Sequence, residues 1–179
     1  LVTNFHVMSD VVHHPDRYRA ELVHEDEPVA IRLLAFDIVH DLAVLEPAAP
    51  HAVSLDLGET KLRKGTRLYA LGNPYDLGLS IVEGTYNGLL EHSRYRRIHF
   101  TGSLNPGMSG GPALLADGRV VGVNVATAGN EVSFLVPARR ARELVDRTLA
   151  PGFAPAADLT AALRSQLDAY QDEYLEDLL

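Results

Sequence analysis

The chain has 179 residues, and its 24 acidic and 16 basic side chains give a net charge of −8, which disfavours a nucleic-acid-binding protein that relies on phosphate contacts. It contains no cysteine, so disulfides, thiolate metal sites and a cysteine nucleophile are excluded, while both the cytoplasm and a bacterial envelope compartment fit this composition. No stretch is long and apolar enough to span a membrane, and the hydrophobic content of 46% supports one well-packed domain or two small barrels that share an interface.

The first third of the sequence predicts short strands joined by polar turns. Residues 1–7 form a β-branched and aromatic run, which predicts a strand with His6 near its end. Residues 18–23 and 29–36 predict two further strands on either side of an acidic turn. Asp41 stands at the start of the next apolar strand, and because carboxylates are poor strand formers, we expect Asp41 to have a partner.

The middle of the chain continues this pattern after a Pro/Ala connector at residues 47–50, which predicts a boundary between two halves. The predicted strands that follow are residues 67–72, 80–86, 88–92, 96–101, 112–115, 119–126 and 133–136. The dipeptide Asp117-Gly118 lies between two of these apolar runs, and it predicts a hairpin turn there.

Helices are predicted only at the end of the chain. Residues 138–149 carry apolar side chains on one side and arginines elsewhere, which predicts an amphipathic helix. Beyond a Pro/Gly breaker, Asp158 is suited to cap a last helix, whose apolar stripe consists of Leu159, Leu163, Leu167, Tyr170, Tyr174 and Leu178. Residues 158–179 either pack against their own barrel or contact a partner chain or a further domain, and an oligomer fits the second alternative.

Many short strands followed by terminal helices predict an all-β fold of antiparallel barrels or a sandwich, and they disfavour a parallel sheet. The sequence opens with Leu1, inside an apolar run and without a methionine. We therefore expect a fragment that lacks its true N-terminus and, with it, any signal peptide.

A glycine-rich loop at residues 101–112 interrupts the strand pattern. Ser109 is flanked there by Gly107, Gly110 and Gly111, so its hydroxyl can sit exposed on a tight turn with backbone N–H groups beside it. That arrangement suits an activated nucleophile next to an oxyanion hole. The alternative is an ordinary glycine-rich hairpin loop.

The order of residues along the chain separates the hydrolase plans. An α/β-hydrolase places its histidine after the serine, but all eight histidines precede Ser109: His6, His13, His14, His24, His40, His51, His92 and His99. The remaining orders are the chymotrypsin-like one, His, Asp, Ser, and the subtilisin one, which begins with Asp and needs a parallel α/β sheet. The strand-rich pattern disfavours the subtilisin plan.

Four short motifs resemble those of HtrA/Deg-type proteases in the trypsin-like superfamily, and they occur in the family's order. TNFHV at residues 3–7 and HDLAVL at residues 40–45 resemble the boxes around the catalytic histidine and aspartate. LGNPY at residues 71–75 resembles the GNP segment, and LNPGMSGGP at residues 104–112 resembles the NPGNSGGP box of the nucleophile. The resemblance extends over residues 1–149.

The resemblance implies a chymotrypsin-like double antiparallel β-barrel with C-terminal helices. Residues 1–150 would form the protease domain, with residues 1–47 as the remainder of the first barrel, 51–137 as the second barrel and 138–149 as a C-terminal helix. Residues 151–179 would form an acidic amphipathic helical extension. The strands that precede the histidine in the family are absent from the sequence, so the first barrel would be open, with an unpaired edge.

The resemblance also implies a serine endopeptidase that acts on polypeptides through an acyl-enzyme, without a cofactor or metal. His6 would be the general base, Asp41 would orient it, and Ser109 would be the nucleophile. The backbone N–H groups of Gly107 and Ser109 would form the oxyanion hole. Asp37 is a local rival to Asp41, and the resemblance selects Asp41.

By the same alignment, Val123, Asn124, Val125 and Ala126 fall on the strand that would pair with the substrate backbone and line the primary pocket. These side chains include no acid, so we expect small or medium apolar residues before the scissile bond. The alternative is that they are ordinary core residues.

Met108 departs from the family pattern, since trypsin has an acidic residue at this place and HtrA relatives often carry Asn. Activation by an ion pair from a new N-terminus is therefore excluded, and the loops must set the oxyanion hole by other means.

The alternative function is a catalytically impaired, protease-like module that binds extended peptides. We interpret His13 and His14 as solvated, and the basic and aromatic run at residues 92–97 as an exposed strand or loop.

Overall fold

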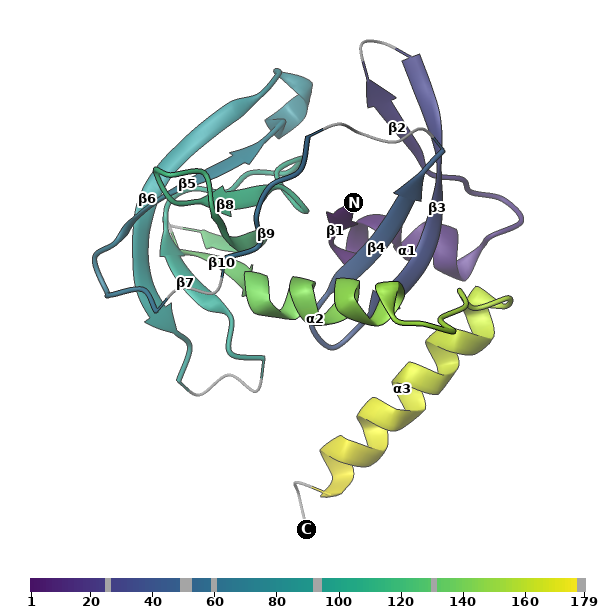
Figure 1. Ribbon diagram of the computed structural model, residues 1–179. Coiled ribbons are helices and arrows are strands. Elements are labelled where there is room, and N and C mark those ends of the chain that lie inside the picture. Colours follow the sequence, from purple (N-terminus) through teal and green to yellow (C-terminus); the bar gives the residue numbers. More distant parts are fainter. Residues whose placement is uncertain (25–26, 49–52, 59–60, 92–94, 130–131, 177–179) are drawn as a thin grey trace. The chain divides into compact units, whose positions relative to one another are not determined.

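The protein folds into two compact units in the computed structural model shown in Figure 1. The first unit contains Leu1–Pro50 and Leu144–Leu179, and the second contains His51–Glu143. The structure describes residues 1–24, 27–48, 53–58, 61–91, 95–129 and 132–176. The predicted acidic turn, the Pro/Ala connector and the basic run at residues 92–97 therefore lie partly outside the described residues.

The second unit is a closed antiparallel barrel with the strand order β10-β7-β6-β5-β8-β9 (Figure 1). Its strands are β5 (Arg67–Gly72), β6 (Ser80–Leu89), β7 (Ile98–Thr101), β8 (Pro112–Leu114), β9 (Val120–Gly129) and β10 (Val132–Pro137). A short 3₁₀ turn, Pro74–Asp76, follows β5. Alternate side chains of the strands point inward, so Leu68, Phe100 and Leu135 form a buried core. The predicted strand at residues 67–72 is confirmed.

One strand replaces the two that the sequence predicts at residues 80–86 and 88–92, and that prediction was wrong. β6 continues through Gly88, where the pairing with β7 is irregular between Tyr86 and Leu89. Gly88 has a φ of +100°, a conformation that glycine adopts without strain. The glycine therefore marks a bulge within one strand and not a break between two.

The first unit contains a four-stranded antiparallel sheet with the order β1-β4-β3-β2. Its strands are β1 (Val2–Thr3), β2 (Glu21–His24), β3 (Glu27–Asp37) and β4 (Leu42–Pro47). β4 is one of the two inner strands, and its residues from Leu42 to Leu45 are all buried. The sheet is open, as the resemblance implied for the first half of the chain.

The prediction of a strand across residues 1–7 was wrong, because a helix, α1 (Phe5–His13), begins there. Only β1 is extended, and Asn4 occupies the N-cap position with an extended backbone. Met8 and Val12 recur at helical spacing and are buried, while Phe5 packs on Phe36 with ring centroids 5.3 Å apart. Tertiary burial of this face overrides the strand preference of the β-branched residues.

The terminal helices are α2 (Ala138–Leu149), which matches its predicted range, and α3 (Leu159–Glu176). The prediction of Asp158 as a cap is confirmed, since its Oδ1 accepts a hydrogen bond from the Ala161 backbone at 2.9 Å. Within the described residues, no helix is long and apolar enough to cross a membrane.

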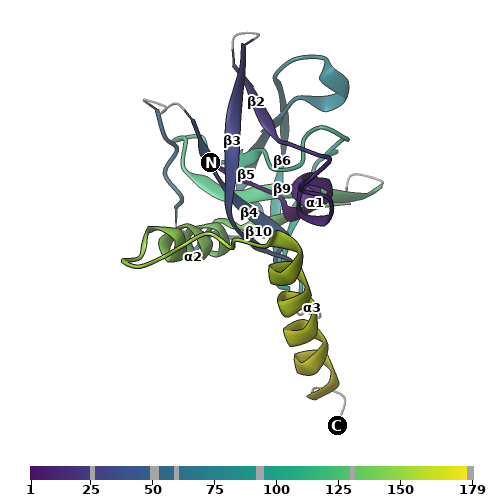
Figure 2. The ribbon, with the colours of Figure 1, turned by 90° about the vertical axis from the view of Figure 1, so that its right-hand side faces the viewer.

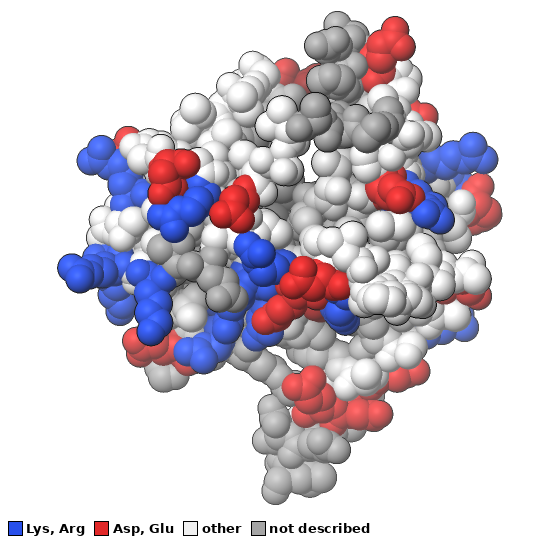
Figure 3. All heavy atoms as spheres, in the orientation of Figure 1, with Lys and Arg blue, Asp and Glu red and all other residues white. Residues whose placement is uncertain are grey.

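The two ends of α3 have different surroundings. Leu163 near its start is 5% exposed and belongs to the core of the first unit with Met8 and Val12. Leu167 and Tyr174 are 48% and 49% exposed, and the helix extends away from the sheet of its own unit in both views (Figures 1 and 2). Acidic side chains gather at this outer end, beside the grey residues (Figure 3). Packing against its own unit therefore holds for the first half of the helix.

We expect Leu163→Ala to lower the free energy of unfolding by about 2–4 kcal/mol, because it removes a buried side chain and leaves a cavity. Leu167→Ala, one turn further along the same helix, should cost less than about 1 kcal/mol because Leu167 is half-exposed. Chemical denaturation of both variants measures the difference. Equal losses would show that the start of α3 is not part of the folded core.

Candidate active site

His6 and Asp41 form a hydrogen-bonded pair in the first unit. His6 lies in the first turn of α1, and Asp41 lies immediately before β4. The Asp41 carboxylate accepts two hydrogen bonds from His6, at 2.8 Å from the ring Nδ1 and at 2.9 Å from the backbone N–H. Because the carboxylate only accepts, Nδ1 carries the proton in this contact, and in the neutral form of the ring Nε2 is then the proton acceptor.

The backbone of Asp41 is held in an unusual conformation. Its φ is +58°, in the left-handed region that few residues other than glycine adopt. The side-chain amide of the fully buried Asn4 donates to the Asp41 carbonyl at 3.0 Å. Asn4 thus links the start of α1 to the residue that orients the His6 ring.

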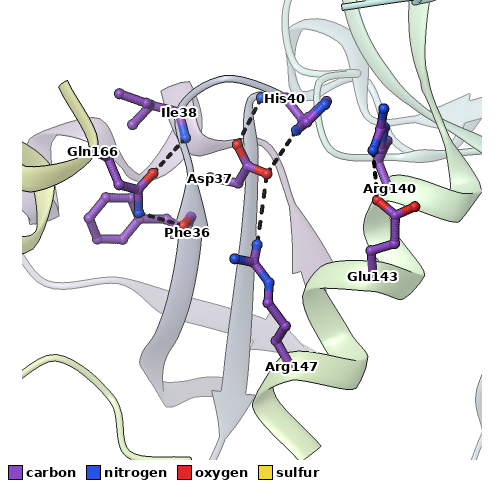
Figure 4. A network of polar contacts seen from close by, with 8 residues as sticks. All are labelled: Phe36, Asp37, Ile38, His40, Arg140, Glu143, Arg147 and Gln166. Carbon is purple, nitrogen blue, oxygen red and sulfur yellow. Dashed lines mark hydrogen bonds and ion pairs between the residues drawn. The ribbon is translucent and has the colours of Figure 1, made fainter. Parts of the chain in front are cut away.

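The rival carboxylate, Asp37, has a different partner. It accepts hydrogen bonds from the His40 backbone at 3.0 Å and from the His40 ring at 2.8 Å, and Arg147 lies 3.8 Å away (Figure 4). Burial alone would raise the pKa of the Asp37 carboxyl, but the hydrogen bonds and charge of His40, together with Arg147, outweigh it and hold this pKa below its ordinary value. Asp37 therefore shapes the turn before Asp41 and does not contact His6.

The serine loop lies in the second unit, where Gly107 has a φ of +94°. The Pro106 carbonyl accepts a hydrogen bond from the Tyr75 backbone at 3.1 Å. Since a trans peptide points its C=O and N–H in opposite directions, this bond aims the Gly107 N–H away from Tyr75. Within the described part of the chain, the amides of Gly107 and Ser109 have no hydrogen-bond partner. Both donors are therefore available to a ligand.

Met108 anchors the serine loop from inside the barrel. Its side chain is fully buried in the cluster that contains Leu68 and Phe100. The absence of a side chain at Gly72 permits this approach, because a Cβ there would lie 2.7 Å from the Met108 Cα. The Met108 carbonyl accepts hydrogen bonds from the Gly111 N–H at 3.1 Å and from the Asn124 side chain at 3.2 Å. Apolar burial and satisfied carbonyls hold this loop without an ion pair.

Ser109 contacts β9, the strand that carries the residues expected to line the pocket. The Ser109 hydroxyl donates to the Val125 carbonyl at 2.9 Å. The Asn124 side chain is fully buried and donates to the Leu71 carbonyl of β5 at 2.9 Å and to the Met108 carbonyl at 3.2 Å, so it links the serine loop to β5. Val125 is also buried, and the side chain of Ala126 lies outside the described residues.

Sequence reasoning missed the positioning roles of Asn4, Tyr75 and Met108. Asn4 and Tyr75 belong to the TNFHV and LGNPY motifs, so the motifs were the available signal, although nothing local indicated which atoms they would hold. Met108 stood out only as a departure from the family pattern. Its burial depends on the closed barrel, which no short window of sequence reveals.

The paired histidines at the end of α1 have a local role. His13 and His14 are exposed, and the His13 ring is hydrogen-bonded to the Ser9 carbonyl at 2.7 Å. Among the residues that the structure describes, no group of three or more metal-ligating side chains is close enough to hold an ion.

Gly107→Ala should disrupt the serine loop, because a Cβ at this position would collide with the Asn73 carbonyl oxygen. The matched control is Gly118→Ala, since Gly118 has a similar φ of +85° but open space around its Cβ position. We expect Gly118→Ala to cost about 1–2 kcal/mol of unfolding free energy, and Gly107→Ala to cost clearly more. Thermal unfolding of the two variants measures this difference, and equal costs would contradict the close approach.

Asp37 should make the free energy of unfolding depend on pH in the acidic range. Its pKa is lower in the folded chain than in the unfolded chain, so the unfolded chain binds more protons as the pH falls below about 5. The free energy of unfolding should therefore decrease from about pH 5 downward, and this decrease should be smaller in Asp37→Asn. Urea titrations at several pH values test the prediction, with the exposed Asp146→Asn as a control that retains the wild-type slope.

Comparisons with known proteins identify the family of this chain. A family model described as a trypsin-like peptidase domain matches residues 1–123. The probable periplasmic serine endoprotease DegP-like of Bartonella henselae is 32% identical over 165 residues, and that of Brucella suis biovar 1 is 33% identical over 166 residues. Each match covers 85% of this chain and 31% of the relative, so the chain spans about a third of their length.

Solved structures share the fold. Deg5 gives a TM-score of 0.71 at 26% identity and covers 84% of this chain and 78% of its own. The HtrA-type protease AlgW with decapeptide gives a TM-score of 0.73 at 24% identity, and covers 84% of this chain and 48% of its own. The closed barrel, the open sheet and the terminal helices thus correspond to the chymotrypsin-like double barrel of HtrA proteases. By its family match, the chain belongs to the trypsin-like peptidases, and its relatives and its fold are similar to the HtrA/Deg-type proteases among them.

Proposed function

We propose that this protein is a serine endopeptidase that uses His6, Asp41 and Ser109 to hydrolyse peptide bonds through an acyl-enzyme. The observation that carries the proposal is the pair of hydrogen bonds from His6 to the Asp41 carboxylate. They fix the ring plane and leave Nε2 as the proton acceptor, as a general base in acyl transfer requires.

In the proposed reaction, Nε2 of His6 takes the Ser109 hydroxyl proton while Oγ attacks the scissile carbonyl carbon. The resulting oxyanion is stabilised by the amides of Gly107 and Ser109, which have no other partner within the described residues. His6 then returns its proton to the leaving amine, and the C–N bond breaks to give the acyl-enzyme. Water, activated in the same way, attacks the ester and releases Ser109.

In this cycle the Asp41 carboxylate stabilises the imidazolium form of His6. The Ser109 hydroxyl must first leave the Val125 carbonyl, because a carbonyl accepts a hydrogen bond but does not remove the proton. This requires only a rotation of the Ser109 side chain about χ1 from one staggered position to another, and a substrate bound beside the serine loop would favour it.

The substrate we propose is an extended polypeptide that adds to β9 as a further strand. The pairing of β9 with β8 ends at Val123, so the following edge has no strand beside it within the described residues. Residues 123–128 contain no charged side chain. We therefore propose small or medium apolar residues before the scissile bond, without a requirement for Lys or Arg.

The second candidate function is a module that binds extended peptides without cleaving them. The hydrogen bond from the Ser109 hydroxyl to the Val125 carbonyl favours this alternative, since a hydroxyl held there is not activated. The open edge of β9 would serve binding equally well, so only a test of the nucleophile separates the two functions.

Ser109→Ala should lower the cleavage of unfolded casein by about 10⁴-fold or more, while peptide binding stays near wild type. A fluorophosphonate probe should label the wild-type protein at Ser109 and leave the variant unlabelled. The matched control is Ser103→Ala, an exposed serine in the same loop, which should keep both cleavage and labelling.

Residual turnover in Ser109→Ala would show that the nucleophile was misassigned. A wild-type protein that binds peptide but neither cleaves casein nor reacts with the probe would favour the binding module.

A further inference from the structure

Helix α3 contacts both elements that carry the His6–Asp41 pair. Its first turns pack on α1, where Leu163 lies in one core cluster with Met8 and Val12. The Thr160 hydroxyl also donates to the Val12 carbonyl at 3.4 Å. The same helix reaches the turn between β3 and β4, which ends at Asp41 (Figure 4).

The Gln166 side chain of α3 makes two hydrogen bonds at this turn. Its Oε1 accepts a hydrogen bond from the Ile38 backbone N–H at 3.1 Å, and its Nε2 donates to the Phe36 carbonyl at 2.8 Å. The amide therefore binds the backbone on both sides of Asp37, as a neighbouring strand would do (Figure 4). This turn leaves β3 at the point where sheet pairing with β4 ends.

The turn needs such support because it holds a strained residue. Asp41 keeps a φ of +58°, and a left-handed conformation in a residue other than glycine persists only where the surroundings determine it. Asp37 fixes the His40 end of the turn, Asn4 fixes the Asp41 carbonyl, and Gln166 fixes the β3 end. A shift at any of these points would move the carboxylate on which the His6 ring is oriented.

We propose that Gln166 is a positioning residue for catalysis. Through this side chain, α3 holds the turn before Asp41 in place and so keeps the His6–Asp41 pair oriented. The inference rests on the proposed function, because orientation of His6 matters only if His6 is the base. The positioning role of Gln166 can be tested apart from the packing of α3 on the first unit, because different side chains make the two kinds of contact. The apolar contacts of α3 come from Leu159, Ala162 and Leu163, whereas the Gln166 amide contributes two hydrogen bonds to the turn.

The test compares Gln166→Met with Gln171→Met in the full chain. Methionine has a similar length and helix propensity to glutamine but cannot make these hydrogen bonds. Gln171 is exposed on the same helix, so its variant controls for the chemistry of the substitution. We expect Gln166→Met to lower kcat for casein-derived peptides by about tenfold with KM within about twofold of wild type, and Gln171→Met to change neither.

A spectroscopic readout separates orientation from general loosening of the fold. In nitrogen-15-labelled protein, the His6 Nδ1 proton should resonate downfield because it is bound to the Asp41 carboxylate. Gln166→Met should shift this resonance or broaden it by faster exchange with water, at a temperature where circular dichroism shows the variant folded. Gln171→Met should leave the resonance unchanged.

A folded Gln166→Met variant with wild-type kcat overturns the proposal, whereas a lower kcat with an altered His6 resonance supports it. If the wild-type protein does not cleave peptides, the proposed function fails, and the resonance alone decides whether Gln166 orients the pair. If Gln166→Met does not fold, Gln166→Glu replaces it, since it keeps the acceptor for Ile38 and should give an intermediate loss. Failure of both variants to fold also overturns the proposal, because Gln166 would then be required for the fold itself.

Discussion

The two hydrogen bonds from His6 to the Asp41 carboxylate are the constraint on which the first unit depends. They require the first turn of α1 to meet a turn that ends in a left-handed residue. Asn4 holds the Asp41 carbonyl, Asp37 binds His40, and Gln166 binds the backbone of β3 and its turn. Together these bonds hold both ends of the turn, so the left-handed conformation of Asp41 is supported by its surroundings.

In the second unit, apolar packing holds the loop that carries Ser109. Burial of an aliphatic side chain contributes on the order of 1.5–3 kcal/mol without the desolvation cost of a buried charge. Met108 supplies this anchor in the barrel core, while the carbonyls of Pro106 and Met108 are held by Tyr75, Gly111 and Asn124. The loop around Ser109 can therefore keep the Gly107 amide directed away from Tyr75 without an ion pair. Met108 replaces the polar residue that the family carries at this place, and its burial in the barrel core explains how the loop is held.

Secondary structure was predictable where the signal was local. The alternation at residues 67–72, the amphipathic pattern of residues 138–149 and the capping Asp158 all gave the observed elements, because each depends on neighbours within a few residues. The same reasoning failed at residues 1–7, where burial of Met8 and Val12 favours a helix over the β-branched preference. It also failed at Gly88, because bulges depend on the register of a partner strand.

The sequence by itself determined the family and the candidate set: four motifs in order, every histidine before Ser109, and no cysteine to replace it. It did not determine which atoms meet. Asp37 and Asp41 are both close to His40 in sequence, and only the tertiary structure joins His6 to Asp41 across 35 residues and Gln166 to Phe36 across 130. The reason is that motif spacing specifies chemical types, whereas a hydrogen bond depends on the position and direction of groups brought together by folding.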